Sequence, residues 1–111
     1  MAHICILSGL EIPKGQYSKE HLVPKARAGV KITQDPRNIL PAAKIMNHLK
    51  ADYLPCEFWE QKYNIAYKAI SSWNIRHADK EFIQKAIENW ERWYNPNWCE
   101  ICLLNCKGLR R

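Results

Sequence analysis

The chain has 111 residues, of which 47% are hydrophobic and 11% are aromatic. This length suffices for one hydrophobic core but not for two independent cores, so residues 1–111 are expected to form a single domain. The aromatic content excludes a disordered chain, because so much apolar surface can offset the entropy lost on folding. The sequence has no run of about 20 apolar residues and no signal peptide, which predicts a cytoplasmic protein without a membrane partner.

Positive charge exceeds negative charge, and the excess lies near the two ends of the sequence. The formal net charge is +6, from 17 Lys and Arg residues against 11 Asp and Glu residues. Residues 1–52 contain eight basic and four acidic side chains, residues 53–94 contain six of each, and residues 95–111 contain three and one. Such segregation suits a polyanionic partner, but charge alone distinguishes poorly, because many small basic proteins bind no nucleic acid.

The first half alternates short extended segments with turns. His3–Leu7 is predicted to be a short strand that forms an irregular hairpin with a second strand over Tyr17–Val23. Residues Lys25–Arg37 are basic and rich in turn-forming residues, which predicts an exposed loop. A helix over Ala42–Asp52 is predicted from its composition and apolar spacing.

Two helices are predicted for the second half. From Glu57 to Trp73, apolar residues recur at alternating intervals of four and three, which is typical of a helix with one apolar face. Asp79 is predicted to cap a second helix that ends before Asn95-Pro96. The short link predicts a helical hairpin over residues 53–94, with its aromatic side chains in the core rather than on a base-stacking surface.

Five residues of the first half offer the side chains that phosphodiester hydrolysis needs, namely Glu20, His21, Asn38, Asn47 and Lys50. The reaction needs a base to activate water and, in metal-dependent enzymes, oxygen ligands for a divalent cation. A neutral imidazole suits the base, and carboxylate and carboxamide oxygens suit Mg²⁺. Lys50, one helical turn after Asn47, is expected to hold a phosphate oxygen. Asn38 is expected to hold the loop after His21 through hydrogen bonds.

The positions of Glu20 and His21 impose a condition on this site. Neighbouring side chains on a strand point to opposite faces, so the two reach one site only where the strand ends or bends, which Pro24 would favour. His48 follows Asn47 directly and is expected to be exposed, because successive helical residues point about 100° apart.

These residues and their order resemble the HNH endonuclease family. The matching text is Glu20-His21-Leu22-Val23-Pro24-Lys25, then Asn38-Ile39-Leu40, then Asn47 with Lys50, within residues 3–52. The resemblance is to the H-N-N variant, as in the HNH domains of RNA-guided CRISPR nucleases. It implies an α+β fold with a small ββα-metal (HNH) core in residues 1–52 and two additional C-terminal helices. It also implies a metal-dependent endonuclease with DNA as the expected partner and RNA as the alternative.

The resemblance assigns a role to each residue. His21 would be the general base, Glu20 and Asn47 would hold Mg²⁺, Mn²⁺ or another divalent cation, and Asn38 would orient the loop after His21. Glu20 departs from the family, where Asp is more usual, so the longer side chain would shift the metal or bind it through water. The residues expected to follow the nucleic-acid backbone are Lys25, Arg27, Lys31, Arg37 and Lys44. The sequence leaves both a monomer and a homodimer open.

The five cysteines favour thiols or metal ligands over a disulfide framework, because their number is odd and no export signal precedes them. Many HNH proteins carry two Cys-x-x-Cys knuckles that bind zinc. Only Cys5 matches here, so apolar packing is expected in place of that zinc. Cys99, Cys102 and Cys106 begin like a zinc site, but free or buried thiols are favoured over structural Zn²⁺ there. Cys56 is expected in the core.

Two functions from other classes stay open. One is a non-catalytic nucleic-acid-binding module on an HNH-like scaffold, in which Glu20 is badly placed for a metal. The other is an interaction domain built around zinc at Cys99, Cys102 and Cys106. Metal-dependent DNA cleavage tests the first alternative, and the zinc content of the purified protein tests the second.

Overall fold

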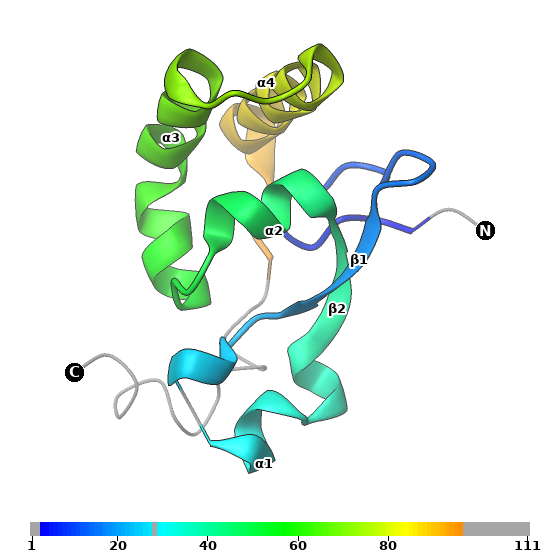
Figure 1. The fold of residues 1–111 in the computed structure, drawn as a ribbon, viewed down its shortest axis with the longest axis vertical. Helices are drawn as coiled ribbons and strands as arrows, with labels where there is room; N and C mark the ends of the chain where they lie inside the picture. The colour runs from blue at the N-terminus through cyan, green and yellow to red at the C-terminus, as the bar shows by residue number, and fades with distance from the viewer. Residues whose placement is uncertain (1–2, 28, 97–111) are drawn as a thin grey trace.

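The computed structural model describes residues 3–27 and 29–96. It is a small α+β domain in which helix α2 lies between a two-stranded sheet and a pair of longer helices, α3 and α4 (Figure 1). The elements in chain order are β1 (Tyr17–His21), η1 (Lys25–Arg27), α1 (Val30–Thr33), η2 (Pro36–Asn38), β2 (Ile39–Ala43), α2 (Lys44–Lys50), α3 (Pro55–Ser72) and α4 (His77–Trp93).

The sheet consists of β1 and β2 in antiparallel register. Tyr17 pairs with Ala43 at one end, and His21 pairs with Ile39 at the other. The 17 residues between the strands, 22–38, therefore lie at the His21 end of the sheet, and α2 begins at the Tyr17 end. This segment was predicted to be an exposed loop, and it contains three short helical turns, η1, α1 and η2.

The predicted strand over His3–Leu7 is wrong. Within the described residues this segment contributes one isolated bridge, between Ile4 and Glu11, and β1 pairs with β2 instead. The Cys5 N–H donates to the Leu10 carbonyl oxygen at 2.8 Å, and the Gly9 N–H donates to the Cys5 carbonyl oxygen at 2.8 Å. These backbone groups are satisfied within a local turn, so they do not form a strand ladder.

The two predicted long helices are confirmed, with different starting points. Pro55 occupies the first turn of α3, and the Glu57 carboxylate accepts a hydrogen bond from the Leu54 N–H at 2.8 Å. The prediction that Asp79 caps α4 is wrong, because the N-cap is Arg76. Asp79 lies in the first turn, where a negative charge is favourable, and its Oδ1 pairs with Arg76 at 3.3 Å.

The aromatic residues on the predicted apolar faces of α3 and α4 pack in or against the core, as predicted, whereas Tyr67 and Trp93 are exposed. Phe58 is fully buried and Trp90 is 5% exposed, and Trp59, Tyr63 and Trp73 pack against the same cluster. The rings of Trp59 and Tyr63 meet the Trp90 ring edge to face, with centroids 6.1 and 5.8 Å apart.

The end of α4 holds the N-terminal segment in place. Three consecutive carbonyl oxygens, those of residues 6–8, accept side-chain hydrogen bonds from this region. Tyr94 Oη donates to Ile6 at 2.6 Å, Trp90 Nε1 to Leu7 at 3.0 Å and Asn89 Nδ2 to Ser8 at 2.7 Å. These donors satisfy carbonyl groups that no strand partner pairs.

The cysteines divide into three groups. Cys5 is fully buried in the core, and its Sγ accepts a hydrogen bond from the Ala43 N–H at 3.3 Å. Cys56 is half-buried and is not part of the core cluster in which it was expected. Cys99, Cys102 and Cys106 lie outside the described residues.

Within the described part of the chain, every helix is too short or too polar to cross a membrane.

Gly9→Ala is expected to lower the free energy of unfolding by about 2–4 kcal/mol. Gly9 has a φ of +76°, and a Cβ at this position would lie 2.6 Å from Asn89 Nδ2 and 2.6 Å from Cδ2 of the Tyr94 ring. The variant therefore adds backbone strain and also displaces two side chains that hold the N-terminal carbonyl groups.

Gly15→Ala is the matched control for this prediction. Gly15 has a φ of +83°, but an added Cβ there meets no atom within 4 Å, so the variant carries the backbone strain alone. Chemical denaturation of both variants measures the difference. Equal losses of stability would show that contact with Asn89 and Tyr94 is unimportant.

Candidate functional site

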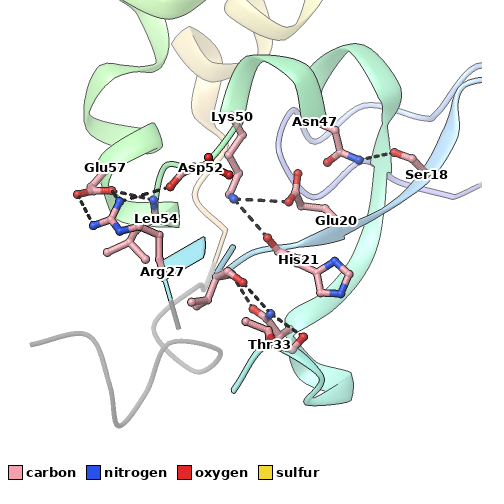
Figure 2. A network of polar contacts seen from close by, with 12 residues as sticks. Ser18, Glu20, His21, Arg27, Thr33, Asn47, Lys50, Asp52, Leu54 and Glu57 are labelled. Carbon is pink, nitrogen blue, oxygen red and sulfur yellow. Dashed lines mark hydrogen bonds and ion pairs between the residues drawn. The ribbon is translucent and has the colours of Figure 1, made fainter. Parts of the chain in front are cut away.

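The alternation of side chains along β1 sorts the candidate residues into two groups. Ser18 and Glu20 face α2, where they contact Asn47 and Lys50 respectively. Figure 2 shows the imidazole ring of His21 on the opposite side of β1 from the Glu20 carboxylate. β1 ends at His21, as the sequence required, but the two side chains still point to opposite faces of the strand.

Glu20 and Lys50 form a buried ion pair. Glu20 is 8% exposed and Lys50 is 0% exposed, and Lys50 Nζ lies 3.5 Å from Glu20 Oε1. Burial raises the pKa of Glu20 to about 7, although the charge and the hydrogen bond of Lys50 act in the opposite direction. Strong charge-assisted hydrogen bonds are about 2.7–2.9 Å long, so Lys50 compensates the carboxylate only in part.

The position of Lys50 differs from the phosphate contact expected from the sequence. Its ammonium group points into the protein, where it also donates to the His21 carbonyl oxygen at 3.3 Å (Figure 2). Lys50 shares a face of α2 with Asn47, and this face is covered by β1. A phosphate contact would require Lys50 to leave Glu20.

The Asn47 carboxamide has one satisfied and one unsatisfied end. Its Nδ2 donates to Ser18 Oγ at 2.5 Å, and Ser18 Oγ donates to the Ala42 carbonyl oxygen at 2.8 Å. Asn47 Oδ1 is buried and is the one such side-chain atom of the described residues without a hydrogen-bond partner. Figure 2 shows this oxygen on the side of Glu20. An unpaired buried acceptor costs about 1–3 kcal/mol, so a donor or a cation is its expected complement.

The Glu20 carboxylate and Asn47 Oδ1 are oxygen acceptors of the kind that hard divalent cations bind. Asn47 Oδ1 is turned to the side of the Glu20 carboxylate, and acceptors that face each other repel unless a positive charge lies between them. The described residues contain no cluster of three or more His, Cys, Asp or Glu side chains that could hold a metal. Mg²⁺ nevertheless suits a site with few protein oxygens, because it keeps several of its water molecules.

His21 is half-buried at the end of β1. Partial burial lowers its pKa below the ordinary value of 6.5, and the positive charges of Lys25 and Lys50 lower it further. A neutral imidazole can accept a proton from water, whereas a protonated one cannot. His48, the neighbour of Asn47 on α2, is exposed, as predicted.

Asn38 is buried and ties the turn after His21 to the start of β2. Its Oδ1 accepts from the Val23 N–H at 2.7 Å, and its Nδ2 donates to the carbonyl oxygens of Val23 and Thr33, both at 3.1 Å. Its own carbonyl oxygen accepts from the Leu22 N–H at 2.9 Å. Because both ends of the carboxamide are occupied, Asn38 supports the turn, which is the role that the sequence suggested.

Three of the five basic residues expected to contact nucleic acid lie at the His21 end of the sheet. Lys25, Lys31 and Arg37 are exposed and belong to the segment between β1 and β2. Arg37 also pairs with Asp35 at 2.7 Å, while its side chain stays 72% exposed. These three residues form the basic segment beside His21.

The other two basic residues are placed differently. Arg27 donates two hydrogen bonds to the Glu57 carboxylate, at 2.8 and 3.2 Å, so its guanidinium links the loop to α3. Lys44 is exposed, but it opens α2 next to Ala43, at the Tyr17 end of the sheet. The structure therefore does not bring all five together.

Ser18 contacts Asn47 but was not among the residues predicted from the sequence. Ser18 lies two residues before Glu20 and shares its face of β1, whereas exposed Lys19 shares the face of His21. The period-two alternation of a strand would have placed both residues once β1 was assigned.

Comparisons of the chain with family models, with curated proteins and with solved structures found no match. Function is therefore inferred from the residues of the site.

The stability of the protein is expected to depend on pH through Glu20. Its pKa in the folded state, about 7, lies above its ordinary value of 4.5, so the folded state binds this proton more tightly. The contribution of Glu20 to stability is therefore fully present below about pH 4.5 and is lost as the pH rises to about 7. Glu20→Gln removes this dependence.

Denaturation curves of wild type and Glu20→Gln between pH 4 and pH 8, recorded in EDTA, measure the effect as a difference. The difference is needed because His21, with a lowered pKa, changes the stability in the opposite direction over part of this range. Parallel curves for the two proteins would mean that Glu20 titrates normally.

Proposed function

We propose that this chain is a metal-dependent endonuclease of the HNH type that hydrolyses phosphodiester bonds in DNA. Support comes from the order of the elements and of the residues that they carry. Glu20 and His21 end β1, Asn38 directly precedes β2, and Asn47 lies in α2. In this proposal β1, β2 and α2 form a ββα-metal core, and α3 and α4 support it from the other side of α2 (Figure 1).

One observation carries the proposal, namely the unsatisfied Asn47 Oδ1 beside the Glu20 carboxylate. A purely structural Asn–Glu contact would place the amide NH₂ toward the carboxylate, because that arrangement satisfies both groups. The observed orientation turns the acceptor Oδ1 to the side of the Glu20 carboxylate, which is favourable when a cation lies between the two groups. Buried polar groups rarely remain unpaired without such a reason.

In the proposed reaction, His21 accepts a proton from the attacking water. The water oxygen forms the new bond to phosphorus as the bond from phosphorus to the leaving sugar oxygen breaks. The lowered pKa of His21 favours the unprotonated imidazole that this step needs. Glu20 and Asn47 would hold Mg²⁺ or Mn²⁺, which when bound supplies Lewis-acid stabilisation of negative charge at the phosphate.

Other residues support these groups. Asn38 fixes the turn that follows His21, and Lys50 holds the Glu20 carboxylate between β1 and α2. The basic segment formed by Lys25, Lys31 and Arg37 would attract the phosphate backbone and make DNA binding weaker at high salt.

Cleavage of supercoiled plasmid tests the proposal. Wild-type protein is expected to nick the plasmid in Mg²⁺ or Mn²⁺ and to be inactive in EDTA. Asn47→Ala is expected to need at least about tenfold more metal for the same rate, because it removes one of the two proposed ligands. If the wild-type protein cleaves DNA with neither Mg²⁺ nor Mn²⁺, the proposed endonuclease activity is refuted.

A second candidate is the non-catalytic nucleic-acid-binding module. The ion pair between Glu20 and Lys50 favours it, because part of the negative charge that would attract a metal is already compensated. This candidate predicts salt-dependent DNA binding without cleavage under any divalent metal. The same plasmid samples, examined by a gel-shift assay, distinguish the two candidates.

A further inference from the structure

The hydrogen bonds of Ser18 decide which end of the Asn47 carboxamide faces Glu20. Ser18 pairs with Ala42 across the sheet, and its hydroxyl donates its single proton to the Ala42 carbonyl oxygen at 2.8 Å. A hydroxyl group that has donated its proton can only accept from a further partner. The group that meets it must be the NH₂ of Asn47, which donates at 2.5 Å. Oδ1 is consequently turned to the side of Glu20 (Figure 2).

Without the Ser18 hydroxyl, the opposite orientation of the carboxamide becomes favourable. The NH₂ of Asn47 would lose its acceptor, and the Glu20 carboxylate is the acceptor on the other side. A hydrogen bond from an amide to a carboxylate is charge-assisted and would satisfy both groups. It would also replace Oδ1 by NH₂ in the space where a cation is proposed to bind.

We propose that Ser18 is a positioning residue of the cation site, which keeps Asn47 Oδ1 directed toward the side of Glu20. This proposal rests on the proposed function, because it requires a divalent cation at Glu20 and Asn47. Ser18 acts through Asn47, since its own oxygen is engaged by Ala42 and by the Asn47 amide. Interactions that orient a metal ligand in this way change metal affinity by about 10–100-fold.

Titration calorimetry with Mn²⁺, on protein without nucleic acid, tests the proposal. Ser18→Ala is expected to weaken Mn²⁺ binding by about tenfold or more, whereas Ser18→Thr, which keeps the hydroxyl, is expected to bind like wild type. Lys19→Ala is the matched control on the opposite face of β1 and should leave the affinity unchanged. In an Asn47→Ala background, Ser18→Ala should cause no further loss, because the residue through which Ser18 acts is absent.

The outcomes separate this proposal from the function on which it rests. Suppose that the wild-type protein binds Mn²⁺, that Glu20→Gln does not, and that Ser18→Ala binds Mn²⁺ as tightly as wild type. The role of Ser18 is then refuted, and the cation site stands. An equal loss from Ser18→Ala with and without Asn47 would also refute it. If wild type binds no Mn²⁺, the proposed function and the role of Ser18 both fail.

A measurement on the wild-type protein makes the test independent of how well the variants fold. The side-chain amide protons of Asn47, identified by their loss in Asn47→Asp, are expected to show nuclear Overhauser effects to the Ser18 β-protons. Effects to the Glu20 γ-protons without any to Ser18 would place the NH₂ on the wrong side and overturn the proposal.

Discussion

His21→Ala is expected to reduce metal-dependent plasmid nicking by about 10²–10⁴-fold, the usual contribution of a general base. The variant removes the one imidazole that lies beside Glu20 in the chain, at the end of β1. Its fold should be preserved, because the side chain is half-buried and α2 packs against the opposite face of β1. The initial rate of conversion from supercoiled to nicked plasmid measures the effect.

His48→Ala is the matched control for this result. His48 is exposed on α2 and directly follows Asn47, so it tests whether any histidine near the proposed metal ligand contributes. It is expected to keep wild-type activity within a factor of about two, the range of ordinary exposed substitutions. Activity that survives in His21→Ala would show that His21 is not the base, and activity lost in His48→Ala would show that the effect is not specific to His21.

Lys50→Met is expected to lower the free energy of unfolding by about 3–5 kcal/mol at pH 8, because it leaves the buried Glu20 carboxylate without its counter-charge. The loss should become smaller at pH 5. The pKa of Glu20 is already raised to about 7, and removing the positive charge raises it further, so a proton can neutralise the carboxylate at low pH. Urea denaturation at both pH values, in EDTA, gives the comparison.

The double variant Glu20→Gln/Lys50→Met is the control for charge. It removes both members of the ion pair and keeps side chains of similar size, so most of the lost stability should return. If the double variant were as unstable as Lys50→Met, the loss would come from the packing of the Lys50 stem or from its hydrogen bond to the His21 carbonyl oxygen.

The sequence predicted the periodic helices correctly, and also the strand within Tyr17–Val23 and the helix within Ala42–Asp52. The regular apolar spacing of α3 and α4 predicted two helices with buried aromatic faces, and both are present. The same reasoning failed for His3–Leu7, where local turn hydrogen bonds and contacts with α4 replace a strand ladder. Contacts with residues more than 80 positions away leave no periodic signal in a short segment.

The site was predictable in its composition but not in its partners. Alternation along β1 required the faces of Glu20 and His21 to differ, and the hydrogen bonds of Asn38 follow the role expected of it. The burial of Lys50 and the pairing of Arg27 with Glu57 could not be predicted, because both depend on elements that only the folded chain brings together. An exposed cation and a buried one look alike in a sequence.

The three hydrogen bonds from the end of α4 to residues 6–8 can form only after α4 has been synthesised. Trp90 is synthesised 83 residues after Leu7, and at about 5–20 residues per second several seconds separate them on the ribosome. Residues 17–50, which supply both strands and α2, have all been made well before then. Until α4 emerges, water must solvate the three carbonyl groups. Residues 6–8 therefore complete these three hydrogen bonds only after the final described helix has left the exit tunnel.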